Sequence, residues 1–92
     1  MDFLRANGVV LHFEDTGGDK PSMVFANSLG TDFRIWDKVA ARLAHDYRII
    51  RYDKRGHGLS EATPAPYAMT DHVNDLAALM DERRVKQAVV VG

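Results

Sequence analysis

The sequence predicts an α/β fold built on one mostly parallel β-sheet, and two observations carry this prediction. From residue 22 onward, short apolar runs rich in Val, Ile and Phe alternate with segments whose apolar residues recur at helical spacing. Strands separated by helices form right-handed parallel crossovers. The last run, residues 87–92, is mostly β-branched and ends on a glycine, which is typical of a buried central strand. The expected order of elements is β-β-β-α-β-α-β.

The first two strands are expected to form an antiparallel hairpin at a sheet edge. Residues 3–6 make one strand candidate and residues 9–14 the next. Between them lies Asn7-Gly8, a strong signal for a two-residue hairpin turn because both positions tolerate positive φ. The second strand alternates between an apolar and a mixed face.

A third strand and the first helix follow. Residues 22–26 are apolar on both faces, which predicts a central strand. After a loop over residues 27–32, a helix is expected over about residues 33–44, capped by Asp32. Its predicted apolar face consists of Ile35, Trp36, Val39, Ala40 and Leu43.

The rest of the chain repeats this alternation. Residues 47–52 predict a fourth strand, residues 53–60 a glycine-rich loop, and residues 70–83 a second helix. Its predicted buried stripe consists of Val73, Leu76, Ala77 and Met80. The terminal run is the fifth strand, and it should lie beside residues 22–26, where the chain reverses direction across the sheet.

Composition excludes several classes of function. The 92 residues are enough for one domain, and the net charge of −1 is spread over interleaved acids and bases. This gives no reason to expect nucleic acid or a membrane as a partner. The chain has no cysteines, so thiolate zinc sites and disulfides are excluded, and no histidine pair has metal-site spacing. With no signal-peptide pattern at the amino terminus, a cytoplasmic location is expected.

The loop Asn27-Ser28-Leu29-Gly30 is the first candidate site. A loop between a parallel strand and a helix presents backbone N–H groups to an anion, which suits an oxyanion hole. Taken on its own, the loop is better explained as a plain turn between a strand and a helix. Trp36, shortly after it, is either a pocket residue or part of the helix core.

The loop from Asp53 to Ser60, Asp-Lys-Arg-Gly-His-Gly-Leu-Ser, is the second candidate site. Its two glycines lack the third glycine of a dinucleotide fingerprint and the Gly-Lys-Ser/Thr of a phosphate loop. Structural packing is therefore favoured, with Asp53 and Arg55 as partners in a local polar network. His57 lies near Asp53, but no serine stands on a strand-to-helix elbow, so catalysis by His57 is not expected.

Taken together, these pieces resemble the amino-terminal part of the α/β-hydrolase fold family along the whole chain. The most specific part is Asp-x-Arg-Gly-x-Gly-x-Ser at residues 53–60. The loop over residues 27–32 resembles that of 3-oxoadipate enol-lactonases, because Asn27-Ser28 stands where most of the superfamily has His-Gly.

The resemblance implies a serine nucleophile in a Gly-x-Ser-x-Gly elbow, with a histidine base and an aspartate, acting on a small ester or lactone. Gly92 would be the first glycine of that elbow, and Leu29 would supply one oxyanion N–H. Asn27, Ser28, Gly30 and Trp36 would then line the loop or pocket. Residues 1–92 would form a partial core domain, with Ser, Asp and His all beyond Gly92 and no cofactor.

Two alternatives stay open. Related enzymes with an aspartate nucleophile, such as epoxide hydrolases and dehalogenases, usually carry a proline where Gly30 stands, which counts against them. The chain taken by itself would be an inactive fragment or a non-enzymatic binding member of the fold. Because the last strand would otherwise present an unpaired apolar edge, it is expected to be covered by further polypeptide.

Overall fold

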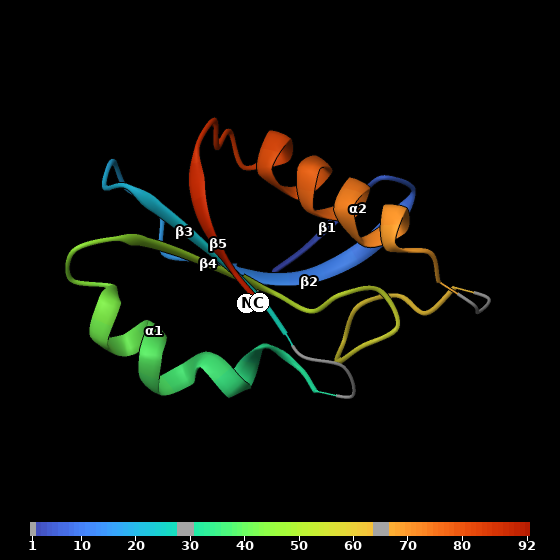
Figure 1. Ribbon diagram of the computed structural model, residues 1–92, viewed down its shortest axis with the longest axis horizontal. Coiled ribbons are helices and arrows are strands. Elements are labelled where there is room, and N and C mark those ends of the chain that lie inside the picture. The colour runs from blue at the N-terminus through green and yellow to red at the C-terminus, as the bar shows by residue number, and fades with distance from the viewer. Residues whose placement is uncertain (1, 28–30, 64–66) are drawn as a thin grey trace.

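The structure is a computed structural model that describes residues 2–27, 31–63 and 67–92 (Figure 1). The predicted order of elements is confirmed, with a short 3₁₀ turn added before the first helix. The elements are β1 (Asp2–Ala6), β2 (Val9–Asp15), β3 (Ser22–Ala26), η1 (Phe33–Trp36), α1 (Asp37–Leu43), β4 (Arg48–Tyr52), α2 (Met69–Glu82) and β5 (Ala88–Val91).

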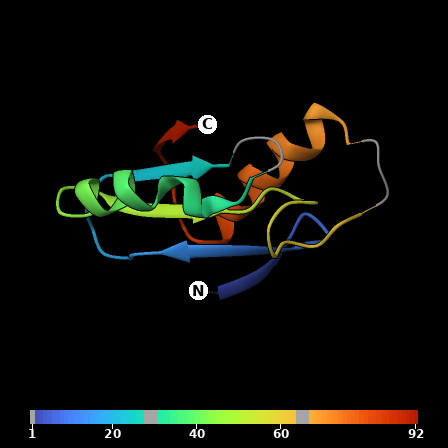
Figure 2. The same cartoon turned by 90° about the horizontal axis from the view of Figure 1, so that it is seen from below.

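One five-stranded sheet runs through the molecule in the order β1-β2-β4-β3-β5 (Figure 2). β2 pairs antiparallel with β1 and with β4, whereas β3 is parallel to both β4 and β5. In the last pair Ser22 lies opposite Ala88 and Phe25 opposite Val91. The expected neighbourhood of the terminal strand and residues 22–26 is therefore confirmed.

The opening hairpin is confirmed as well. Asn7 has φ of 50° and Gly8 has φ of 78°. Both central turn residues thus have the left-handed backbone that a two-residue hairpin turn demands.

The two helices cover opposite faces of the sheet and divide the core in two (Figure 1). Under α2, Leu79 packs among side chains of β2, β3 and β4. Under α1, Ala40 packs against Phe25 and Ile49. Because both faces are covered, β3 and β4 contribute apolar side chains to both halves of the core: Val24 and Ile50 to the half under α2, and Phe25 and Ile49 to the half under α1.

The predicted helix faces are partly wrong. On the first helix, Ile35 and Val39 are 45% and 42% exposed, and Phe33 is buried instead. The helix begins with a 3₁₀ turn, which has a different period and shifts the phase of the stripe.

On α2 the predicted stripe is also displaced. Val73 is 55% exposed and Ala77 is exposed, whereas Asp75 and Leu79 are buried. A charged residue at the centre of the buried face cannot be anticipated from hydrophobic periodicity. Its partner, Arg55, lies in a loop 20 residues earlier.

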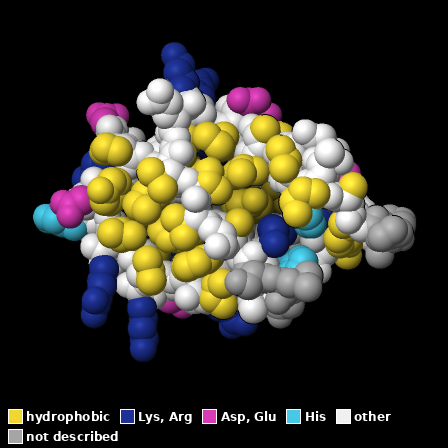
Figure 3. All heavy atoms as spheres, viewed as in Figure 1, with side chains coloured by type: hydrophobic (Ala, Val, Ile, Leu, Met, Phe, Trp, Pro, Cys, Tyr) yellow, Lys and Arg dark blue, Asp and Glu magenta, His cyan; other side chains and the backbone are white. Residues whose placement is uncertain are grey.

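The prediction that the last strand is buried is wrong for the described chain. Val89 and Val90 are 58% and 49% exposed, because β5 forms one edge of the sheet. Figure 3 shows apolar side chains gathered across the middle of the face where β5 lies between the two helices. Among the described residues, no helix has the length and apolar character needed to cross a membrane.

Candidate active site

The carboxyl ends of β3 and β5 lie side by side at one edge of the sheet. Phe25 is in register with Val91, and a Cβ placed on Gly92 would lie 4.0 Å from the Cβ of Ala26. Gly92 is thus next to the start of the loop that follows β3. In an open α/β sheet this edge, where the strand order reverses, is where ligands bind.

Of the predicted loop residues, Ser28, Leu29 and Gly30 lie outside the described residues. Asn27 is 2% exposed, and both ends of its amide are engaged. Its Nδ2 donates to the Thr31 carbonyl at 2.7 Å, and its Oδ1 accepts from the Lys54 N–H at 2.8 Å. The Asn27 side chain therefore ties its loop to the residues after β4.

Trp36 belongs to the packing around β3. Its indole N–H donates to the Ala26 carbonyl at 3.0 Å, and its ring lies 5.2 Å from that of Phe25, centroid to centroid. The side chain is only half-buried. The bond to Ala26 fixes the end of β3 just before the loop begins.

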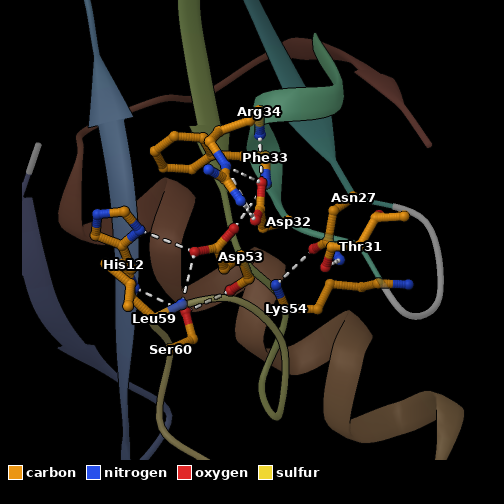
Figure 4. Close-up of polar contacts among 10 residues, drawn as sticks. All are labelled: His12, Asn27, Thr31, Asp32, Phe33, Arg34, Asp53, Lys54, Leu59 and Ser60. Atoms are coloured by element: carbon orange, nitrogen blue, oxygen red, sulfur yellow. Dashed lines mark hydrogen bonds and ion pairs between the residues drawn. The ribbon is translucent and has the colours of Figure 1, made fainter. Parts of the chain in front are cut away.

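Asp53 lies directly after β4, and its carboxylate contacts three separate segments of the chain (Figure 4). It is 1% exposed. Its Oδ1 accepts from the Phe33 N–H at 2.7 Å, and its Oδ2 accepts from the Leu59 N–H at 3.0 Å. The Nδ1 of His12 lies 2.8 Å from the same Oδ2. One carboxylate thus joins β2, the start of η1 and the glycine-rich loop.

The histidine that meets Asp53 is His12 and not His57. His57 Nδ1 lies 3.1 Å from the Arg55 carbonyl oxygen, within its own loop. Ser60 is also occupied: its hydroxyl donates to the Asp53 carbonyl at 2.6 Å and accepts from the His12 N–H at 2.8 Å. Because this hydroxyl is buried and already makes two hydrogen bonds, it is unsuited to act as a nucleophile.

Asp53 and Arg55 do not form the pair that the sequence suggests. Arg55 makes two hydrogen bonds of 2.7 Å to the carboxylate of Asp75 on α2. The same carboxylate accepts from the amide of Asn7 in the hairpin turn at 3.0 Å. The loop is therefore structural, as expected, but its two charged residues anchor it to different elements.

The ionisation of two further groups near β4 is shifted. Burial raises the pKa of Tyr52 to about 12, with the nearby charge of Asp75 acting in the same direction. Burial lowers the pKa of His72, and the cation of Lys54 lowers it further. In both cases burial acts against the charged form of the side chain.

A hollow of about 380 Å³ opens beside this network, lined by His12, Asp32, Phe33, Arg34, Asp53, Gly58 and Leu59. The described residues contain no group of three His, Cys, Asp or Glu side chains placed to hold a metal ion. What the edge does contain is Asn27, held by hydrogen bonds to Thr31 and Lys54 directly after Ala26, the residue that lies beside Gly92.

A profile of the alpha/beta hydrolase fold matches residues 21–92. The chain belongs to this family. The match extends over β3, α1, β4, α2 and β5, and so includes the strands whose carboxyl ends form the edge described above.

Two hydrolases similar to this chain are enol-lactonases. The chain is 37% identical to 3-oxoadipate enol-lactonase 2 of Acinetobacter baylyi over 99% of its length and 34% of that protein. The solved enol-lactonase of Burkholderia xenovorans superimposes with a TM-score of 0.92 at 38% identity, over 97% of this chain and 35% of the other.

Other hydrolases share the same arrangement. A solved epoxide hydrolase of Vigna radiata superimposes with a TM-score of 0.85 at 26% identity, over 97% of this chain and 30% of the other. The chain spans about a third of the length of the relatives that it matches.

Sequence reasoning missed the pairing of His12 with Asp53. The one signal in the sequence was a histidine on the mixed face of the second strand. The pairing depends on the register of β2 with β4, in which Phe13 lies opposite Tyr52, and no local pattern specifies it.

Proposed function

We propose that this chain is the amino-terminal part of a serine hydrolase that cleaves a small carboxylic ester or lactone through an acyl-enzyme. The favoured substrate is 3-oxoadipate enol-lactone. The observation that carries the proposal is the similarity to two enol-lactonases along nearly the whole chain, at 37% and 38% identity. The same fold is shared by hydrolases of other substrates, so the choice of substrate rests on this similarity.

In the proposed mechanism, the serine lies two residues after Gly92, in a Gly-x-Ser-x-Gly elbow. A histidine accepts its proton and later donates it to the leaving group, and an aspartate orients that histidine. The backbone N–H of Leu29 and the N–H of the residue after the serine hold the oxyanion. The position of Gly92 beside Ala26 supports this assignment, because Leu29 follows Ala26 by three residues in the sequence and the proposed serine follows Gly92 by two.

The domain assignment forms part of the proposal. Residues 1–92 are taken as a partial core domain, and the remaining polypeptide covers the open edge of β5. The partner is a small ester or lactone, without a cofactor, nucleic acid or membrane, and the location is cytoplasmic. The exposed valines of β5 support the proposed covering, since an apolar strand edge that is bare in water associates with other chains.

The test uses the complete hydrolase that contains this chain. We expect it to hydrolyse 3-oxoadipate enol-lactone and to react with a fluorophosphonate, and mass spectrometry should locate the adduct on a serine two residues after Gly92. Alanine at that serine should abolish both reactions. Absence of lactone and ester hydrolysis, or an adduct at another residue, would contradict the proposal.

A second candidate is an aspartate-nucleophile hydrolase, favoured by the close superposition on an epoxide hydrolase. The same experiment separates the two. An aspartate two residues after Gly92, with turnover of styrene oxide and no fluorophosphonate adduct, would select the second candidate.

A further inference from the structure

The loop between β3 and η1 is attached at both of its described ends to one dipeptide. At its start, Asn27 accepts the Lys54 N–H through Oδ1 at 2.8 Å. At its end, the Phe33 N–H donates to Asp53 Oδ1 at 2.7 Å. Asp53 and Lys54 are consecutive and directly follow β4, so both attachments lead to the end of a central strand (Figure 4).

The Asn27 amide also bridges the loop from one end to the other. Its Nδ2 donates to the Thr31 carbonyl at 2.7 Å, four residues along the chain. An amide can do this because it carries a donor and an acceptor on one rigid plane, whereas a carboxylate carries acceptors alone. The choice of asparagine at this position therefore has a geometric reason.

Asp53, which holds the Phe33 end of the loop, is itself held in place. Asp53 is almost fully buried, and its second oxygen is fixed by the Leu59 N–H at 3.0 Å and by His12 Nδ1 at 2.8 Å. A buried carboxylate with charge-assisted hydrogen bonds on both oxygens keeps one orientation. The Phe33 N–H is thus bound to an acceptor whose position is set by β2 and by the glycine-rich loop.

We infer that Asn27 and Asp53 are positioning residues for the reaction, which fix the two described ends of the loop between β3 and η1, at Asn27 and at Thr31 to Phe33. The inference rests on the proposed function, in which this loop supplies one oxyanion N–H. Neither residue touches substrate. They act because an oxyanion hole is effective only when its donors are oriented before the charge develops.

The expected effect is on turnover rather than on substrate binding. A displacement of about 1 Å at a catalytic group can lower a rate about 100-fold. In the complete hydrolase, Asn27→Ala and Asp53→Asn should lower kcat by about 10- to 100-fold and change KM by less than about threefold, because the oxyanion donor acts mainly in the transition state.

The affinity of the enzyme for a trifluoromethyl ketone inhibitor is a second measurement, and a purely structural role of Asn27 and Asp53 would not change it. The adduct of the ketone with the serine places an alkoxide in the oxyanion hole, so its affinity should fall in parallel with kcat in both variants. Asn27→Asp serves as a second variant of the same size. It keeps the acceptor for Lys54 but removes the donor to Thr31, and it should also lose at least about tenfold in kcat.

The matched control is Asp15→Asn, which disturbs a buried carboxylate network at the opposite end of β4. It should lower the melting temperature while kcat stays within about twofold of the parent enzyme. If the parent enzyme is active but Asn27→Asp and Asp53→Asn keep kcat and ketone affinity within about twofold, the inference is wrong. If the parent enzyme neither hydrolyses ester nor binds the ketone, the proposed function itself fails.

Discussion

Gly58 lies so close to Asp53 that no other residue fits without a shift. It has φ of 49°, and a Cβ at this position would lie 2.3 Å from Asp53 Oδ2. The glycine thus permits both a left-handed backbone and the approach of the loop to the buried carboxylate. This explains the second glycine of the Asp-x-Arg-Gly-x-Gly-x-Ser loop without any phosphate ligand.

Replacing Gly58 by alanine should lower the unfolding free energy more than replacing another glycine that also has positive φ. Gly58→Ala adds overlap with Asp53, worth about 1–3 kcal/mol, to the strain of positive φ. Gly17→Ala is the matched control, since Gly17 has φ of 70° but no atom within 4 Å of the added Cβ. We expect the unfolding free energy in urea to fall by at least about 1 kcal/mol more for Gly58→Ala. Equal losses would contradict this interpretation of the loop.

At the scale of elements, α2 is attached to the loop after β4 through a buried ion pair. Asp75 is 1% exposed and binds Arg55 with two hydrogen bonds and Asn7 with one. Because Arg55 is also largely buried, removal of its partner leaves a cation without a counter-charge. The pair therefore fixes where the helix lies relative to the hairpin.

Asp75→Ala should lower the unfolding free energy by about 3–5 kcal/mol. Asp81→Ala is the control on the same helix: Asp81 is exposed, and its change should stay within about 0.5 kcal/mol. Both are measured by urea unfolding of the complete hydrolase. The double variant Asp75→Leu with Arg55→Met should recover most of the lost unfolding free energy. If Asp75→Ala loses no unfolding free energy, the buried-pair interpretation is wrong.

A second network joins β2, β4 and the end of α2. Asp15 accepts hydrogen bonds from Arg48, from Arg83 and from the Gly17 N–H. Burial by itself would raise the pKa of Asp15, but the bonds from Arg48, Gly17 and Arg83 outweigh it and hold the pKa below its usual range.

This depressed pKa has a defined effect on acid stability. A group whose pKa is lower in the folded than in the unfolded state contributes stability above its unfolded value, near 3.8, and this contribution is lost as the pH falls through the folded value. The parent enzyme should therefore lose more unfolding free energy than Asp15→Asn between about pH 5 and about pH 2.5. Parallel pH profiles for the two proteins in urea unfolding would contradict the assignment.

At the scale of the whole molecule, the sheet has two edge strands, β1 and β5. The antiparallel hairpin ends it at β1, whereas β5 at the other end is short, apolar and exposed at Val89 and Val90. In Figure 3 apolar side chains form a broad patch on the face where β5 lies between the two helices. An uncovered face of this kind favours association with further polypeptide.

We expect the 92-residue chain expressed by itself to be inactive toward p-nitrophenyl acetate and to self-associate. Val89→Lys combined with Val90→Lys should reduce self-association, because charged side chains on an edge strand oppose pairing with another chain. Light scattering measures the association. A monomeric unmodified chain would contradict the proposed covering of β5, and ester turnover would contradict the placing of the nucleophile beyond Gly92.

The sequence by itself determined the order of the elements, the hairpin turn and the neighbourhood of β3 and β5. These follow from local signals: Asn7-Gly8 for the turn, apolar runs for β3 and β5, and crossover rules for the strand order. The motif at residues 53–60 also indicated the family, because its residue types and spacing are specific by themselves. Hydrophobic periodicity was less reliable for the two helices, because a 3₁₀ turn and a buried aspartate each displaced the core-facing side.

The tertiary structure alone decided which polar groups meet. His12 and Asp53 are 41 residues apart, and Asp75 and Asn7 are 68 apart. Contacts at such separations depend on strand register and helix placement, which local sequence does not encode. The same reason explains why Asn27 was recognisable as part of a loop, while its role in tying that loop to the end of β4 emerged only from the folded chain.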